Sequence, residues 1–111
     1  MELSKRYKES KVITKTTKIV NENGIHMRPC MEIVDVSEKF DSDINISKDG
    51  IEWLNAKSMM HICSIGIKAG SDLMIRAEGH DEATAVDAIM ELVEKGFGEK
   101  IVENRDEHKN L

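Results

Sequence analysis

The feature that most constrains the fold of this chain is the changing spacing of its hydrophobic residues. Between residues 12 and 20, β-branched residues interleave with lysine, a pattern typical of a half-exposed strand. After Pro29, the residues expected to be buried recur at three- and four-residue steps, which predicts a helix. The buried face of that helix is expected to comprise Cys30, Ile33, Val34, Ser37 and Phe40. The first two predicted elements are therefore a strand and a helix.

The remaining sequence predicts further strands and helices by the same reasoning. Strands are expected at residues 43–47, 51–54 and 73–77. Residues 48–50, Lys-Asp-Gly, read as a hairpin turn between the first two of these strands. Ser58 is expected to be the N-cap of a short helix, and Asp81 the N-cap of the last helix, which stops near Gly96.

This order of elements, strand–helix–strand–strand–helix–strand–helix, predicts an α+β fold with one sheet covered on one face by helices. The 111 residues have the size of one domain. We place that domain at residues 12–99. Residues 1–11 are expected to be a flexible N-terminal extension, and residues 100–111 a loose polar tail.

Composition excludes several classes of protein. No apolar run approaches the roughly 20 residues of a transmembrane helix, and the charged N-terminus lacks the apolar core of a signal peptide. The net charge of -5, with basic residues dispersed along the chain, argues against nucleic acid as the main partner. Cys30 and Cys63 have no disulfide-framework spacing, so we interpret both as free thiols in the cytoplasm.

The segment Gly24-Ile25-His26-Met27-Arg28-Pro29 carries the chemistry. A helix that begins near Met27 places His26 at its N-terminus, where free backbone N–H groups and the helix dipole favour an anion. The same positive potential favours a neutral imidazole, whose lone pair can attack phosphorus. Arg28 can contact phosphate oxygens. Gly24 permits the turn into the helix, and Pro29 makes its first turn rigid.

The residues of this segment also allow two other interpretations, a histidine without chemistry and a zinc site. His26 could be a helix-start histidine without chemistry, but each neighbour has a separate role in a phosphate site. His26, Cys30, His61 and Cys63 together offer the nitrogen and sulfur ligands that zinc accepts. Because Cys30 belongs to the buried helix face and His26 precedes the helix, we expect their side chains to diverge and predict no metal site.

The sequence resembles HPr, the histidine-containing phosphocarrier family of the bacterial sugar phosphotransferase system, from about residue 14 to residue 98. The resemblance rests on residues 24–29, on Asn55-Ala56-Lys57-Ser58-Met59-Met60 with 64–66, and on residues 75–79. It implies an open-faced β-sandwich of four antiparallel strands and three helices. It also implies that His26 accepts a phosphoryl group from enzyme I and passes it to enzyme IIA domains, with Arg28 assisting. We expect a monomeric carrier without a cofactor, not an independent enzyme.

Ser58 matches the serine that HPr kinase/phosphorylase modifies in many members of the family. An N-cap serine is explained by structure alone, so its regulation stays open. An alternative function is therefore an HPr-like regulatory docking module, controlled through Ser58 and not used for sugar transport. Met27 stands where the family usually has a small residue, and His61 stands close to Ser58. One extra residue near 51–54, which includes Trp53, is expected to form a bulge. These departures leave partner specificity open.

Overall fold

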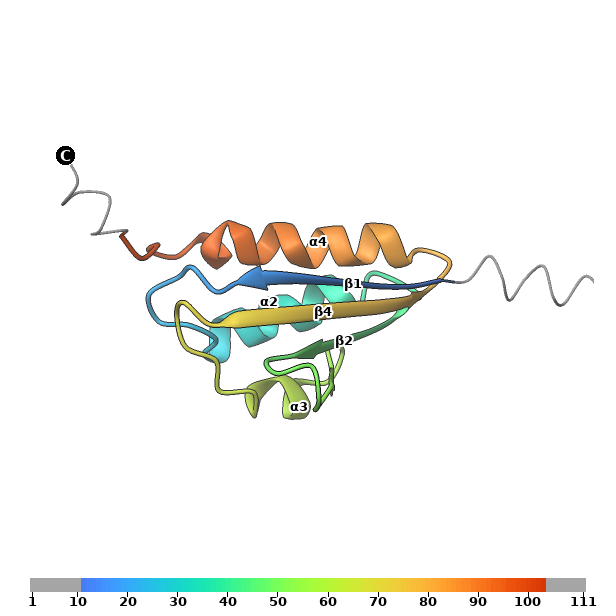
Figure 1. Cartoon of the computed structure of the whole chain (residues 1–111), viewed down its shortest axis with the longest axis horizontal. Helices are drawn as coiled ribbons and strands as arrows, with labels where there is room; N and C mark the ends of the chain where they lie inside the picture. Colours follow the sequence, from blue (N-terminus) through green and yellow to red (C-terminus); the bar gives the residue numbers. More distant parts are fainter. Residues whose placement is uncertain (1–10, 104–111) are drawn as a thin grey trace, which may run out of the picture.

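One four-stranded antiparallel sheet forms the centre of the molecule (Figure 1). It is seen in a computed structural model that describes residues 11–103. The strands are β1 (Lys11–Lys18), β2 (Asp43–Ser47), β3 (Leu54–Asn55) and β4 (Asp72–Gly79). Their order in the sheet is β1-β4-β2-β3, so β4 lies between strands that precede it in the sequence.

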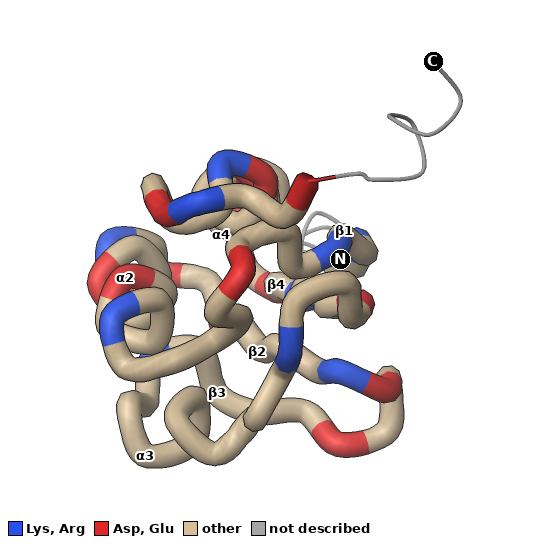
Figure 2. The backbone as a smooth tube through the Cα atoms, turned by 90° about the vertical axis from the view of Figure 1, so that its left-hand side faces the viewer, with Lys and Arg blue, Asp and Glu red and all other residues tan. Residues whose placement is uncertain are grey.

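The helices of the described residues lie on one face of this sheet, as the end-on view in Figure 2 shows. They are α2 (Met27–Ser37), α3 (Met59–Cys63) and α4 (Glu82–Glu94), followed by the short 3₁₀ helix η1 (Gly96–Gly98). The opposite face of the sheet carries no helix in this part of the chain. The predicted α+β, open-faced β-sandwich with strand–helix–strand–strand–helix–strand–helix order is therefore confirmed.

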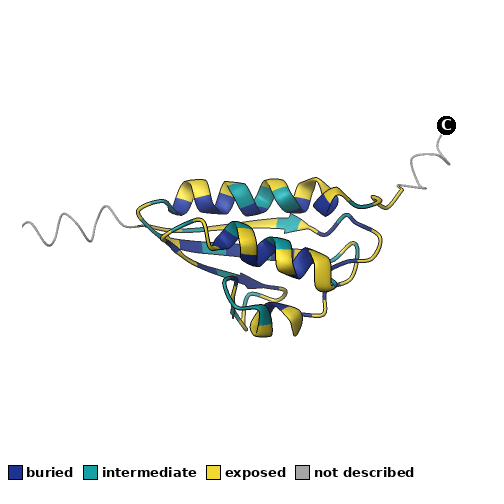
Figure 3. Ribbon diagram, turned by 180° about the vertical axis from the view of Figure 1, so that it is seen from behind, coloured by how far each residue is buried: buried dark blue, intermediate teal, exposed yellow. Residues whose placement is uncertain are grey.

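The core lies between the sheet and the helices, where each helix turns its buried side toward the strands (Figure 3). On α2, Cys30, Ile33, Val34 and Ser37 are buried as predicted, whereas Phe40 follows the helix and is half-buried. Alternate residues of β4 are fully buried because strand side chains point to opposite faces in turn. Each buried isoleucine or valine contributes roughly 1.5–3 kcal/mol through removal of its side chain from water.

The predicted strand at residues 51–54 is wrong in its extent. The chain returns to the sheet only at Leu54 and Asn55, which pair with β2. The carboxylate of Asp49 accepts hydrogen bonds from the backbone N–H groups of Ile51 and Glu52, at 2.8 and 3.0 Å. These bonds wrap residues 49–52 into a loop, so residues 51–53 do not form the strand in which a bulge was expected.

Asp81 stands at the N-cap position of α4, but its side chain makes no capping bond. Its carboxylate instead accepts the backbone N–H groups of Asp41 and Ser42, both at 2.9 Å, and the Ser42 hydroxyl. Asp81 is therefore the predicted N-cap residue of α4 by position, but its side chain fastens the loop before β2 to the start of the helix.

The described part of the C-terminal segment is paired with the loop that follows β1. Ile101 forms a β-bridge with Asn21, and the Val102 N–H donates to the Val20 carbonyl at 2.8 Å. The Glu22 N–H donates to the Lys100 carbonyl at 2.9 Å. Lys100 to Val102 are thus held in place, contrary to the expected loose tail. Residues 1–10 and 104–111, which include most of the predicted N-terminal extension, lie outside the described residues.

Candidate functional site

His26 is the N-cap residue of α2, as the sequence predicts. Its backbone is extended, with φ -115° and ψ -168°, and its carbonyl accepts the Cys30 N–H at 3.0 Å, which opens the helix. The imidazole makes no capping hydrogen bond, and 40% of the side chain is exposed. The ring therefore stands at the helix N-terminus, where backbone N–H groups lack intrahelical partners, and can be reached from solvent.

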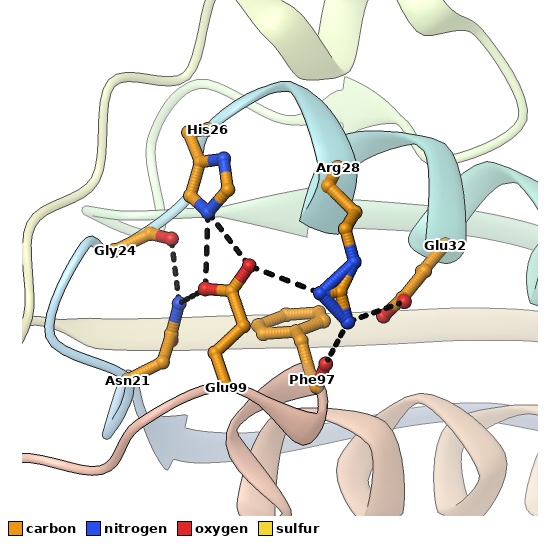
Figure 4. A network of polar contacts seen from close by, with 7 residues as sticks. All are labelled: Asn21, Gly24, His26, Arg28, Glu32, Phe97 and Glu99. Atoms are coloured by element: carbon orange, nitrogen blue, oxygen red, sulfur yellow. Dashed lines mark hydrogen bonds and ion pairs between the residues drawn. The ribbon is translucent and has the colours of Figure 1, made fainter.

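A carboxylate from the far end of the chain contacts the imidazole. The Glu99 oxygens lie 2.8 and 3.0 Å from Nε2 of His26 (Figure 4). The Nδ2 amide of the fully buried Asn21 donates to Glu99 at 3.0 Å and to the Gly24 carbonyl at 2.7 Å. The pKa of Glu99 is lowered, chiefly by the His26 hydrogen bond and then by Asn21 and Arg28. Glu99 is thus an ionised acceptor held from two sides.

This contact determines which imidazole nitrogen keeps a free lone pair. An ionised carboxylate only accepts hydrogen bonds, so Nε2 of His26 must carry the hydrogen that Glu99 receives. In the neutral ring, Nδ1 then holds the free lone pair. Figure 4 shows Nδ1 directed away from Glu99. The geometry accordingly leaves Nδ1 as the nitrogen able to form a bond to phosphorus.

The Arg28 guanidinium is held beside this pair by groups from two segments. It donates to the Phe97 carbonyl at 2.9 Å and lies 3.4 Å from a Glu99 oxygen and 3.5 Å from Glu32. Its side chain is 53% exposed, so these longer ion pairs are weak and can exchange for a stronger partner. Arg28 is close enough to the site to contact a phosphoryl group after a rotation of its side chain.

The supporting residues lie where the sequence places them. Gly24 has φ +65°, and a Cβ there would lie 2.4 Å from the Ile67 carbonyl oxygen, so no larger residue fits. Pro29 is buried in the first turn of α2, where its missing N–H leaves no bond unmade. Met27, the first helical residue, is 61% exposed beside His26.

Comparison with known proteins decides the family. The profile described as "PTS HPr component phosphorylation site" matches residues 13–95. The chain belongs to the HPr family of phosphotransferase-system phosphocarriers. The phosphocarrier protein HPr of Treponema pallidum (strain Nichols) is 37% identical over 89 residues, which cover 80% of this chain and 100% of that protein.

Solved HPr structures agree with this assignment. HPr-C-His from Thermoanaerobacter tengcongensis is 39% identical, with a TM-score of 0.75, and the match covers 80% of this chain and 99% of that chain. The crystal structure of an HPr dimer from the same organism is 41% identical, with a TM-score of 0.62, and covers 75% and 94% of the respective chains. Within residues 11–103, no helix is long and apolar enough to cross a membrane.

Ser58 is the N-cap of α3 as predicted. Its hydroxyl accepts the His61 N–H at a long 3.4 Å, and the residue is half-buried. Because α3 packs beside α2, Ser58 belongs to the same helical side of the molecule as His26. Trp53 lies elsewhere, under the Arg76 guanidinium, whose central carbon is 4.1 Å from the ring centroid.

The four residues that offer nitrogen and sulfur ligands for zinc do not form one cluster. They are His26, Cys30, His61 and Cys63. Among the described residues, the only group of three or more His, Cys, Asp or Glu ligand atoms within 4.8 Å of one another is Asp41, His80 and Asp81. These residues lie at the opposite end of β4 from the His26 loop, and the His80 imidazole lies 2.8 Å from the Asp41 carboxylate. His26 and Cys63 contact different partners, Glu99 and Met27.

Glu99 and Asn21 are the site residues that sequence reasoning missed. Asn21 stood in the Asn-Glu-Asn-Gly turn before the motif, and Glu99 stood at the last position of the predicted domain. The sequence signal that could have indicated Glu99 was the segment Gly96-Phe97-Gly98, whose two glycines favour a turn. In the structure all three residues have positive φ. Such a segment reverses the chain, and here it returns Glu99 to the start of α2.

Proposed function

We propose that His26 accepts a phosphoryl group at Nδ1 from phosphorylated enzyme I and passes it to sugar-specific enzyme IIA domains. The observation that carries this proposal is the Glu99 carboxylate on Nε2, which leaves Nδ1 as the free nucleophile at a helix N-terminus. The carrier acts as a cytoplasmic monomer and needs no cofactor of its own. Phosphoryl transfer of this kind depends on positioning and on stabilisation of charge.

The proposed phosphoryl transfer needs no group beyond the donor, the acceptor and the residues described above. The Nδ1 lone pair forms a bond to phosphorus as the bond between phosphorus and the donor group of enzyme I breaks, and Nε2 keeps its hydrogen. Positive charge then develops on the ring, and the adjacent Glu99 carboxylate stabilises it. Arg28 exchanges its weak contacts with Glu99 and Glu32 for the phosphoryl oxygens. The reverse movements release the group to the acceptor.

Incubation with phosphoenolpyruvate and enzyme I tests this function, with intact-mass measurement as the readout. We expect one acid-labile phosphate on the protein, absent in His26→Ala and formed more slowly in Arg28→Ala. Phosphorus–nitrogen correlation by NMR should place the phosphate on Nδ1. Labelling of His26→Ala at the rate of the unmodified protein would show that another residue is the acceptor.

We also propose that Ser58 is a regulatory phosphorylation site for an HPr kinase. Within residues 11–103, the one hydrogen bond of its hydroxyl is the long 3.4 Å bond to the His61 N–H, so the hydroxyl can be withdrawn at little cost. A phosphoserine would add about two negative charges to the helical side that also carries His26. Incubation with ATP and the kinase should add an acid-stable phosphate that is absent in Ser58→Ala. If the relay test fails and this test succeeds, the regulatory docking function replaces the carrier function.

A further inference from the structure

Two sulfur atoms meet where α2 packs against α3, and a third lies one helical turn away on α2. Met27 is the first residue of α2, Cys30 lies one turn later, and Cys63 is the last residue of α3. The Met27 Sδ and Cys63 Sγ atoms are 4.0 Å apart. Residues three apart on a helix lie on the same side, so Met27 and Cys30 face α3 together. Both cysteines are free.

The two thiols also interact with each other. Burial raises the pKa of Cys30 to about 11, and the charge and hydrogen bonding of the Cys63 thiol add to the increase. Cys30 is 2% exposed, whereas Cys63 is exposed. The group therefore has one ligand anchored in the core and two at the surface, which leaves an entry path for a small ion.

The distance between the Met27 and Cys63 sulfur atoms suits a metal ion with three sulfur ligands. Metal–sulfur bonds of about 2.3 Å in a trigonal plane place the sulfur atoms about 4.0 Å apart. The Met27–Cys63 separation already has this value. Thiolate and thioether ligands together select Cu(I), whereas zinc prefers four ligands drawn from thiolate, imidazole and carboxylate. The sulfur cluster offers no carboxylate and no imidazole of its own.

We propose that Met27, Cys30 and Cys63 form a three-sulfur binding site for monovalent copper. On binding, each thiol releases its proton to solvent and the Met27 thioether coordinates without proton loss, so the occupied site has one net negative charge. The site does not use the imidazole of His26, and the proposal stands whether or not His26 carries phosphate. Copper would fix the exposed Met27 side chain against α3, next to the imidazole.

Titration of the fully reduced protein with Cu(I) under nitrogen tests the site, with bicinchoninate as the competing chelator. We expect one copper per chain in the native mass spectrum. X-ray absorption should show three sulfur neighbours at about 2.3 Å and no nitrogen. Cys63→Ser, an exposed change, should weaken Cu(I) binding roughly 100-fold or more, since even outer-shell partners contribute about 10- to 100-fold.

Matched variants separate this site from nonspecific methionine binding. Met27→Leu should leave two sulfur neighbours in the absorption spectrum and weaken binding on the order of 10-fold. Met31→Leu and Met60→Leu remove other exposed methionines from α2 and α3 and should change nothing. His26→Ala should retain full copper affinity. Thermal unfolding of each apo variant checks that the fold is kept.

Several results would overturn the proposal. Unchanged Cu(I) affinity in Cys63→Ser would show that the Cys63 thiolate is not a copper ligand. Loss of copper binding in His26→Ala, or a nitrogen neighbour in the absorption spectrum, would assign the metal to imidazole.

Discussion

Glu99 and His26 are separated by 73 residues in the sequence, yet the Glu99 carboxylate lies 2.8 Å from Nε2 of the imidazole. The contact closes the proposed phosphoryl-acceptor site from the C-terminal side. In the transfer that we propose, it would orient the ring, hold the hydrogen on Nε2 and balance the positive charge that develops. The three left-handed residues of η1 are what allow the chain to reverse after α4 and deliver this carboxylate.

Glu99→Gln should slow phosphorylation of His26. The amide can donate as well as accept, so it no longer enforces a hydrogen on Nε2. We expect a rate lower by roughly 10- to 100-fold, less than the about 10⁴-fold lost when a buried catalytic carboxylate is neutralised, because the His26 side chain is 40% exposed. Rapid-quench phosphorylation by enzyme I gives the rate, and nitrogen NMR gives the tautomer. Glu103→Gln, an exposed substitution nearby, is the control. Equal rates for both variants would remove Glu99 from the mechanism.

Arg28→Lys should separate charge from geometry at the site. Lysine keeps the positive charge but cannot contact the Phe97 carbonyl and a phosphoryl group with a planar fork of donors. We expect phosphorylation to be slowed on the order of 10-fold in Arg28→Lys and more in Arg28→Ala. The same rapid-quench assay provides the comparison. A lysine variant as fast as the unmodified protein would mean that charge alone suffices.

The sequence was sufficient for the layered fold because local periodicity and tertiary burial agree. Alternate residues of β4 and the three- and four-residue steps of α2 are buried as their spacing requires. The position of His26 followed from the same agreement, since Pro29 and the periodic face together locate the start of α2. Ser58 was located by its ordinary preference for an N-cap.

Features set by the partners of individual polar side chains could not be predicted in this way. The Glu99 carboxylate reaches His26 through tertiary structure, and the Gly-Phe-Gly segment before it indicates a chain reversal but not the partner. The Asp49 carboxylate caps a loop that competes with the expected strand pairing. Asp81 has the composition of an N-cap, but its oxygens are taken by the backbone of residues 41 and 42.

Asp81 should make the stability of the fold sensitive to acid. Hydrogen bonds from Ser42 and from the backbone lower its pKa from 3.8 to about 2 in the folded protein. Because the folded value lies below the unfolded one, its contribution is full above pH 3.8 and disappears as pH falls toward about 2. Asp81→Asn should therefore lower the melting temperature near neutral pH. As the pH falls from 3.8 toward about 2, the melting temperatures of the variant and the unmodified protein should converge.

The control for acid sensitivity is Asp35→Asn, an exposed change on α2 that also removes one carboxyl group. Its melting temperature should follow that of the unmodified protein across the same pH range. A constant difference between Asp81→Asn and the unmodified protein down to about pH 2 would show that the Asp81 carboxylate is not the titrating group.

Gly24→Ala should destabilise the protein much more than Gly70→Ala, although both glycines have positive φ. A Cβ at Gly24, φ +65°, would lie 2.4 Å from the Ile67 carbonyl oxygen, whereas a Cβ at Gly70, φ +86°, meets nothing within 4 Å. Gly70→Ala then measures backbone strain alone, about 1–2 kcal/mol. Gly24→Ala adds a clash with backbone, and we expect about 3 kcal/mol or more. The Ile25 N–H donates to the same carbonyl at 2.9 Å, so relief of the clash must move the segment that carries His26. Urea unfolding of both variants measures the difference. Equal losses would mean that the loop yields freely and that Gly24 serves only its backbone conformation.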